Sequence, residues 1–214
     1  MSDQQSDQKE ITKQYFDGVV QDYLLRYVTD ASAWECYTLM MGMLPMEDDL
    51  DVLDVGCGPG FIGWTLSLEG SRVVGIDLSQ KMIDFANEHY ASKNAKFQVA
   101  DVECFTTNKR FDVVIAKGVF EYLSDDMKAL KNIYNVLTRH GFLIAEFRNA
   151  GFKHGDPNYV DPYPMKRRAH SVSEVVSETK RVGFRVVDTV YYHYHKGLKL
   201  PEAASAFVMK LQKV

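Results

Sequence analysis

The segment VLDVGCGPGFIG, residues 52–63, combines a short apolar run with a turn rich in glycine. Asp54 lies two residues before the first glycine of this turn. Glycine lets a backbone approach a ligand closely, and the first turn of a following helix offers free N–H groups. The segment therefore predicts a ligand-binding loop, although glycines also form ordinary turns. Its glycines are Gly56, Gly58, Gly60 and Gly63.

Two further carboxylates follow strand-like runs later in the chain. Asp77 ends the run RVVGID, 23 residues after Asp54, and Asp101 follows the run KFQVA. A carboxylate at Asp77 can accept hydrogen bonds from both ribose hydroxyls of an adenosine, and one at Asp101 can face the exocyclic amine of an adenine. Because open α/β sheets bind ligands at the carboxyl ends of their strands, we expect the three carboxylates to converge on one crevice.

Two kinds of ligand fit the glycine loop by itself. Gly58, Gly60 and Gly63 match the GxGxxG pattern of dinucleotide sites, in which a doubly charged pyrophosphate lies over the turn. Asp54 would then lie close to like charge in a shielded crevice, which costs free energy. S-adenosylmethionine suits Asp54 better, because it carries a sulfonium and an ammonium as well as a ribose and an adenine. The residues therefore favour S-adenosylmethionine over NAD.

Short apolar runs alternate with amphipathic segments along most of the chain, and these elements must position the carboxylates. Runs that are apolar on both faces and separated by helices are typical of a parallel sheet covered on both sides. Candidate N-caps precede the helical patterns: Ser79, Ser124, and Ser171 or Ser173. The expected strands are residues 52–55, 72–76, 95–99, 111–116, 142–147, 184–194 and 206–211. The expected helices are residues 61–69, 80–90 and 125–138 and a further helix that ends at Arg181.

Two segments fall outside this alternation. Residues 11–43 have a helical pattern rich in aromatics that Pro45 ends, and we expect the ten residues before it to be disordered or loosely helical. Residues 151–170 carry Gly155, Pro157, Pro162 and Pro164, and a loop this long tends to be a lid or a binding loop rather than an ordinary surface insertion. We therefore expect a helical cap over residues 1–45 and a domain over residues 46–214.

Four segments in succession resemble the motifs of class I S-adenosylmethionine-dependent methyltransferases: LDVGCGPG, GIDLSQKMIDFA, QVADVECF and FDVVIAKGVFEYLSDDMKALKNIYNVLTRHGFLIAEF. The resemblance covers about Asp51 to Phe147 and is closest to the small-molecule branch that includes the ubiquinone-type and magnesium-protoporphyrin O-methyltransferases. It implies a Rossmann-like sheet of seven mostly parallel strands with helices on both faces, an antiparallel last strand and an N-terminal helical lid. It also implies methyl transfer from S-adenosylmethionine to a small-molecule acceptor.

The resemblance implies roles for the residues that match the cofactor motifs. Asp54 would hold the amino end of the methionine part, often through water, and the backbone carbonyl of Lys117 would meet the same amino group. A lysine is unusual at that position. The residues that would wrap the methionine part are Gly56, Cys57, Gly58 and Gly60.

At the adenosine end, Asp77 would take the ribose hydroxyls. Leu78 would lie against the adenine face, and Met82 would close that pocket, unless the two are ordinary core residues. Asp101 would read the adenine amine, and the backbone N–H of Val102 would meet a ring nitrogen.

The methyl group of a sulfonium is already activated, so transfer is an in-line displacement for which the enzyme aligns the reactants and needs no metal. A hydroxyl or ammonium acceptor must also lose a proton. The candidate bases are Glu121, which could instead be a cap, His154, which could be a surface loop residue, and His193, which could lie on an edge strand. The candidate substrate residues are Tyr15, Phe16, Tyr122 and His170, of which the first two could be core and the last a surface loop residue.

Composition narrows the function further. With 25 basic and 29 acidic residues the net charge is −4, which argues against a broad nucleic-acid-binding face. The polar first ten residues predict no secretory signal, and no apolar run is long enough to span a bilayer, so we expect a cytoplasmic protein. The three cysteines have no metal-ligand spacing and are expected to be reduced thiols. Neither the acceptor atom nor the oligomeric state follows from the sequence.

Three other functions stay open. Two observations disfavour methylation of protein or RNA. The fourth strand runs into the sequence AKGVF and is not followed by an NPPY-like tetrapeptide, and no basic domain is appended. A non-catalytic partner subunit is disfavoured by the complete motif set. A dinucleotide oxidoreductase accounts for the glycine loop but not for Asp54 or Asp101.

Overall fold

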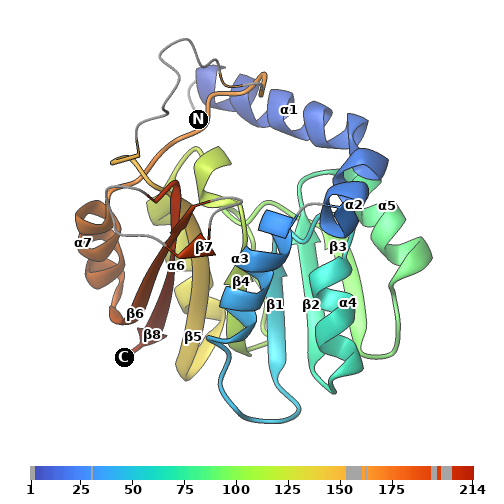
Figure 1. The fold of residues 1–214 in the computed structure, drawn as a ribbon. Helices are drawn as coiled ribbons and strands as arrows, with labels where there is room; N and C mark the ends of the chain where they lie inside the picture. The colour runs from blue at the N-terminus through green and yellow to red at the C-terminus, as the bar shows by residue number, and fades with distance from the viewer. Residues whose placement is uncertain (1–2, 30, 153–160, 162, 194–196, 199–203) are drawn as a thin grey trace.

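A twisted, mostly parallel sheet forms the centre of the computed structural model (Figure 1). The structure describes residues 3–29, 31–152, 161, 163–193, 197–198 and 204–214. The strand order is β3-β2-β1-β4-β5-β8-β6-β7. The strands β1 to β5 run parallel, and β8 lies antiparallel between β5 and β6. Their bounds are β1 Asp51–Val55, β2 Arg72–Asp77, β3 Ala95–Val99, β4 Phe111–Ala116, β5 Leu137–Arg148, β6 Phe184–His193, β7 Gly197–Leu198 and β8 Ala206–Lys213.

This sheet confirms the expected Rossmann-like fold with an antiparallel last strand. Seven strands were expected, and the two-residue β7, which pairs antiparallel with β6, extends the sheet by one more. The strand order reverses between β1 and β4, which are neighbours in the sheet. In open α/β sheets ligands bind in the crevice at such a reversal, beyond the carboxyl ends of the strands.

Helices cover both faces of the sheet because alternate strand residues point to opposite sides. On β4, Val113 and Ile115 join one apolar cluster together with residues of α3 and α4, whereas Val114 faces the cluster that contains α6 and α7. The helices are α1 Asp3–Gly18, α2 Val20–Thr29, α3 Ala31–Met41, α4 Phe61–Leu68, α5 Gln80–His89, α6 Asp126–Val136 and α7 Val172–Val182, with the 3₁₀ turn η1 Phe120–Tyr122. No helix in the described ranges is long and apolar enough to cross a membrane.

Two of the predicted N-caps are confirmed and one is wrong. The hydroxyl of Ser79 accepts the N–H of Met82 at 3.1 Å, and that of Ser171 accepts the N–H of Glu174 at 3.2 Å. The cap of α6 is Asp125 and not Ser124. Oδ1 of Asp125 accepts the N–H of Lys128 at 3.1 Å, and the helix begins one residue later than expected. The carboxylate of Glu103 accepts the backbone N–H of Ser124 at 2.6 Å beside this cap.

The N-terminal region is helical from residue 3 onward. Residues 3–10, expected to be disordered or loosely helical, form the first half of α1. Figure 1 shows α1 running across one end of the sheet, and its side chains Lys9 and Asp17 are bonded to loops that follow β3 and β2. These long-range contacts, which local sequence does not report, hold a polar helix in place.

Candidate active site

A cavity lies between α1 and the carboxyl ends of the parallel strands, at the reversal of strand order. One side of the cavity comes from α1 and α2: Lys9, Thr12, Lys13, Phe16 and Tyr23. Its other walls come from the ends of β1 to β4 and the segments after them: Val55, Gly56, Gly58, Ile76, Asp77, Leu78, Met82, Ala100, Val102, Lys117, Gly118, Val119, Tyr122 and Leu123. The cavity thus gathers segments that are far apart in the sequence.

The glycine loop needs its glycines for both conformation and space. Gly56 has φ 65° and Gly60 has φ 90°, in the left-handed region that side chains disfavour. A Cβ on Gly56 would lie 2.4 Å from Cγ2 of Val119, and one on Gly60 would lie 2.8 Å from Cβ of Ala86. The loop can therefore approach the cavity wall and α5 only as bare backbone.

Cys57 points away from the cavity. Its side chain is buried in the apolar cluster of Ile83 and Phe97, and burial raises the pKa of its thiol well above the usual range. Its backbone N–H donates to the carbonyl of Ile76 at 3.0 Å, which ties the loop to β2. Among the described residues, the cavity lining includes neither Cys57 nor Gly60.

Asp77 holds the glycine loop and faces the cavity. Its Oδ2 accepts the backbone N–H of Gly58 at 2.9 Å, and its Oδ1 accepts the N–H of Ser79 at 2.8 Å. Burial raises the pKa of Asp77 above its usual range, while these N–H groups favour the ionised form. Each carboxylate oxygen has a second lone pair, so Asp77, the predicted partner of the ribose hydroxyls, can still accept hydrogen bonds from the cavity.

Asp54 is enclosed behind the glycine loop. It is 1 % exposed, and its Oδ2 has no hydrogen-bond partner within the part of the chain that the structure describes. Burial and the negative charge of Asp77 raise the pKa of Asp54 to about 7. The backbone N–H of Gly63 favours the ionised form of Asp54. A buried carboxylate oxygen without a partner is costly, so this position fits a nearby cationic group, as the predicted role requires.

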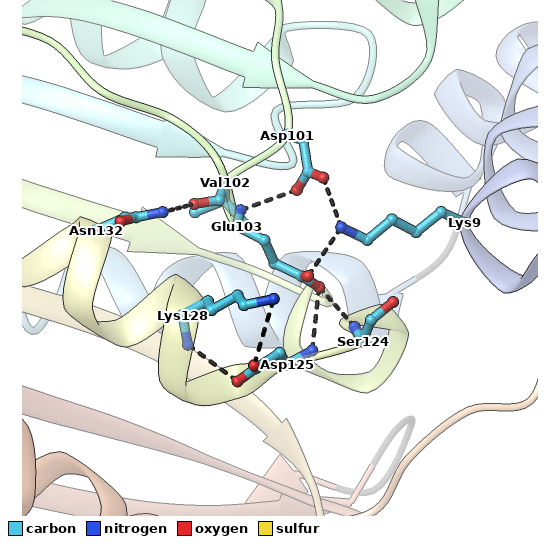
Figure 2. Close-up of polar contacts among 8 residues, drawn as sticks. All are labelled: Lys9, Asp101, Val102, Glu103, Ser124, Asp125, Lys128 and Asn132. Atoms are coloured by element: carbon cyan, nitrogen blue, oxygen red, sulfur yellow. Dashed lines mark hydrogen bonds and ion pairs between the residues drawn. The ribbon is translucent and has the colours of Figure 1, made fainter. Parts of the chain in front are cut away.

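A small ion-pair network joins α1 to the turn after β3 (Figure 2). The ammonium of Lys9 lies 2.6 Å from Oδ2 of Asp101 and 2.8 Å from Oε2 of Glu103. Oδ1 of Asp101 accepts the backbone N–H of Glu103 at 2.8 Å. The carbonyl of Val102 accepts the side-chain amide of Asn132 at 2.9 Å, which fixes this turn from the side of α6.

Lys9 and Glu103 are site residues that the sequence analysis missed. Glu103 follows Asp101 by two residues, just past the same predicted strand, and could have been noticed from that spacing. Lys9 carries no local signal, because only the path of α1 brings it over β3. The remaining predicted adenine residues, Leu78 and Met82, line the same cavity, and Lys117 lines it at the end of β4.

Beyond Tyr122 the cavity borders a charged and aromatic cluster. Oε2 of Glu121 lies 3.3 Å from Nη1 of Arg167, whose guanidinium stacks 4.1 Å above the ring of Tyr163. Burial raises the pKa of Glu121 to about 7, against the positive charge of Arg167. Among the described residues the lining includes Tyr122 but not Glu121.

The predicted lid aromatics make contact across this cluster. The ring of Phe16 packs edge-on against that of Tyr122 at 5.3 Å, and the ring of Tyr15 lies 5.4 Å from that of Tyr163. Phe16 and Tyr122 line the cavity, whereas Tyr15 faces Tyr163 beside it. The structure therefore brings three of the four predicted substrate residues together.

The predicted histidines are not in this group. His154 lies outside the described residues, as do the other residues of segment 153–160 and residue 162 of the predicted substrate loop. His193 packs its ring 5.0 Å from that of Phe152 and does not belong to the described cavity lining.

The fourth predicted substrate residue, His170, is enclosed. It has no exposed surface, and its Nε2 lies 2.8 Å from Oδ2 of Asp126. Asp126 also pairs with Arg168 at 2.8 Å. The alternative of a surface loop residue is therefore wrong. The described cavity lining does not include His170 either, and its backbone pairing with Asn149 and Arg148 joins this segment to the end of β5.

Comparison with known proteins agrees with this arrangement. A family model described as "Methyltransferase domain" matches residues 46–187. The ubiquinone biosynthesis O-methyltransferase of Coxiella burnetii (strain RSA 493 / Nine Mile phase I) is 29% identical over 157 residues, which are 67% of each chain.

Solved structures show the same fold at low identity. A putative S-adenosylmethionine dependent methyltransferase from Listeria monocytogenes aligns with a TM-score of 0.71 and 18% identity, over 85% of this chain and 99% of that chain. The 1,6-didemethyltoxoflavin-N1-methyltransferase of Burkholderia thailandensis aligns with a TM-score of 0.75 and 16% identity, over 98% and 90%. The latter structure contains bound 1,6-didemethyltoxoflavin and S-adenosylhomocysteine.

Proposed function

The chain belongs to the family of methyltransferase domains, and from this premise we propose that it transfers a methyl group from S-adenosylmethionine to a small-molecule acceptor, releasing S-adenosylhomocysteine. S-adenosylmethionine is the cofactor, and when bound it supplies a methyl group activated by the sulfonium. One observation carries the proposal. Three carboxylates lie at the carboxyl ends of neighbouring parallel strands: Asp77, which lines the cavity, Asp54, which is buried behind the glycine loop, and Asp101, at the turn after β3. The described cavity lining includes neither Asp54 nor Asp101.

The residues at one end of the cavity suit the methionine part of the cofactor. Gly56 and Gly58 would present backbone to it, and the open first turn of α4 lies next to them. Asp54 would stabilise the ammonium group, directly or through water. The carbonyl of Lys117 would accept from the same ammonium.

The residues at the other end suit the adenosine part. Asp77 is held in place by two backbone N–H groups and would accept from the ribose hydroxyls. Leu78 and Met82 would enclose the adenine. Asp101 and the N–H of Val102 would bind its polar edge.

Glu121 is the candidate general base. Its pKa of about 7 suits proton removal from an acceptor near neutral pH. The neighbouring Tyr122 lines the cavity, and Arg167 holds the carboxylate at its border. His193 and His154 stay secondary candidates.

A helical cap over residues 1–45 would close the site and exclude water. The aromatic contacts of Phe16 and the ion pair of Lys9 support this role. This division of the chain at residue 45, and a cytoplasmic location, are part of the proposal.

The acceptor class rests on the relatives. The name of the Coxiella protein identifies an O-methyltransferase of ubiquinone biosynthesis, which supports a hydroxyl group of a small molecule as acceptor here. The test is transfer of methyl label from S-adenosylmethionine into fractionated cell extract. We expect the label in a small molecule that mass spectrometry identifies. Label in protein or RNA alone would contradict the proposed acceptor class.

A further inference from the structure

We propose that Lys9 competes with the exocyclic amine of the cofactor's adenine for Oδ2 of Asp101. Lys9 would thereby determine how strongly the site recognises that amine. The inference rests on the proposed function, because it takes adenine to be the group that Asp101 binds. It assigns a role in the cofactor site to a residue of the lid.

Lys9 and the predicted adenine residues share one cavity. Lys9 lines it together with Leu78, Met82 and Val102. Its side chain is only 15 % exposed, and its Nζ lies 2.6 Å from Oδ2 of Asp101. Figure 2 shows the ammonium between the carboxylates of Asp101 and Glu103, beside the turn at Val102.

The two oxygens of Asp101 have different partners. Oδ1 accepts the backbone N–H of Glu103 at 2.8 Å and belongs to the turn. Oδ2 is the oxygen directed toward the lid, and Lys9 bonds to it. An adenine amine that approached this carboxylate from the cavity would meet the oxygen that already holds the ammonium.

A neutral amine cannot match an ammonium at a carboxylate, since charge-assisted hydrogen bonds are roughly twice as strong as neutral ones. Exchange is still possible because Lys9 has a second acceptor, Oε2 of Glu103 at 2.8 Å. Backbone N–H groups of Ser124 and Asp125 hold the other oxygen of Glu103 at 2.6 and 3.2 Å. Glu103 therefore keeps Lys9 paired when the amine takes Asp101, and the amine gains less than it would at a free carboxylate.

The test must separate this competition from a general loosening of α1. The helix has a second attachment, where Oδ1 of Asp17 accepts from the hydroxyl of Ser79 at 2.6 Å and the N–H of Lys81 at 3.2 Å. A looser lid would weaken every ligand alike. The ratio of affinities for two ligands that differ only in the amine cancels that effect.

The experiment measures the dissociation constants of S-adenosylhomocysteine and of its analogue with unsubstituted purine in place of adenine, on the full chain. In Lys9→Met we expect the preference for adenine over purine to rise on the order of tenfold above wild type, because a hydrogen bond to an unopposed carboxylate is worth that much. Lys13→Met is the matched control: Lys13 lines the same cavity one turn later but pairs with Asp17 at 3.2 Å, so the preference should stay at the wild-type value.

The outcomes separate the two levels of the account. Equal preference for adenine in Lys9→Met and wild type, with both ligands binding, would overturn the competition and leave the proposed function intact. A rise of the same size in Lys13→Met would also overturn it, because any lid cation would then suffice. Failure of the wild-type protein to bind S-adenosylhomocysteine would overturn the proposed function and this inference together.

Discussion

The carboxylate of Asp77 accepts the backbone N–H of Gly58 at 2.9 Å and so connects the end of β2 to the glycine loop after β1. The same carboxylate faces the cavity. One side chain thus shapes the loop proposed to hold the methionine part and supplies the proposed ribose acceptor. Its removal should affect both ends of the bound cofactor.

Asp77→Ala should weaken binding of S-adenosylhomocysteine by about 1–3 kcal/mol, because the ribose hydroxyls lose a charged acceptor. Calorimetric titration measures this loss. Asp51→Ala is the control, since Asp51 lies at the opposite end of the sheet in a partly exposed pair with Arg72. The affinity of this variant for S-adenosylhomocysteine should equal that of wild type. Unchanged affinity in Asp77→Ala would refute the ribose role.

Asp54 should make cofactor binding depend on pH. Burial and Asp77 raise its pKa to about 7 in the free protein, whereas Lys117 favours the ionised form. The cofactor's ammonium requires the ionised form, so affinity for S-adenosylhomocysteine should rise as pH increases toward 7 and level off above it. Calorimetric titrations at several pH values should show that the affinity for S-adenosylhomocysteine rises with pH in wild type. In Asp54→Asn this rise should be absent.

The same group should lower the stability of the free protein as pH rises. The folded state keeps the Asp54 proton up to a pKa of about 7, whereas the unfolded chain releases it near 3.8. Between these values the folded state binds more protons, so the free energy of unfolding contributed by Asp54 falls with increasing pH. Denaturant unfolding of wild type and Asp54→Asn at several pH values measures this contribution. If the difference in free energy of unfolding between the two proteins does not change with pH, the assignment of this pKa to Asp54 is wrong.

Glu121→Gln should slow methyl transfer by roughly 100-fold or more while leaving cofactor affinity unchanged, since general base catalysis typically contributes this much. The initial rate of label transfer into an accepting extract fraction measures the first effect, and calorimetry measures the second. Glu174→Gln is a suitable control, because Glu174 pairs with Arg168 outside the described cavity lining. A normal rate in Glu121→Gln would remove this residue from the mechanism.

Deletion of residues 1–14 should leave the domain folded but release the ligand faster. No residue of α1 belongs to the apolar clusters of the described core, so the melting temperature should fall by only a few degrees. Loss of the part of the cavity wall that the first half of α1 forms should raise the dissociation rate of S-adenosylhomocysteine several-fold. A dissociation rate equal to that of wild type would mean that α1 is no lid.

Local sequence predicted those parts of the fold that local physics determines. Apolar runs such as FDVVIA became β4, and Ser79 and Ser171 cap helices as expected. The errors lie where distant residues intervene. Glu103 bonds the N–H groups of Ser124 and Asp125 at the start of α6, which lies one residue later than expected. The ladder of β5 begins at Leu137 opposite Phe111, where a longer helix was expected.

The same distinction holds for the site. The glycine loop and Asp77 lie next to the cavity because they end consecutive parallel strands, which sequence periodicity reveals. The Lys9 pair depends on the path of α1 over the sheet, and the enclosure of His170 depends on Asp126, 44 residues away. No local pattern reports either contact.

The central claim is that the glycine loop binds S-adenosylmethionine, and parallel thermal-shift and calorimetric titrations with S-adenosylmethionine, S-adenosylhomocysteine, NAD and NADH test it most directly. At about 100 times its dissociation constant a ligand adds about 2.7 kcal/mol of stability, which corresponds to roughly 5–10 °C for a chain of this size. We predict that only the two sulfur compounds produce this shift. A shift with NAD or NADH and none with the sulfur compounds would contradict the account.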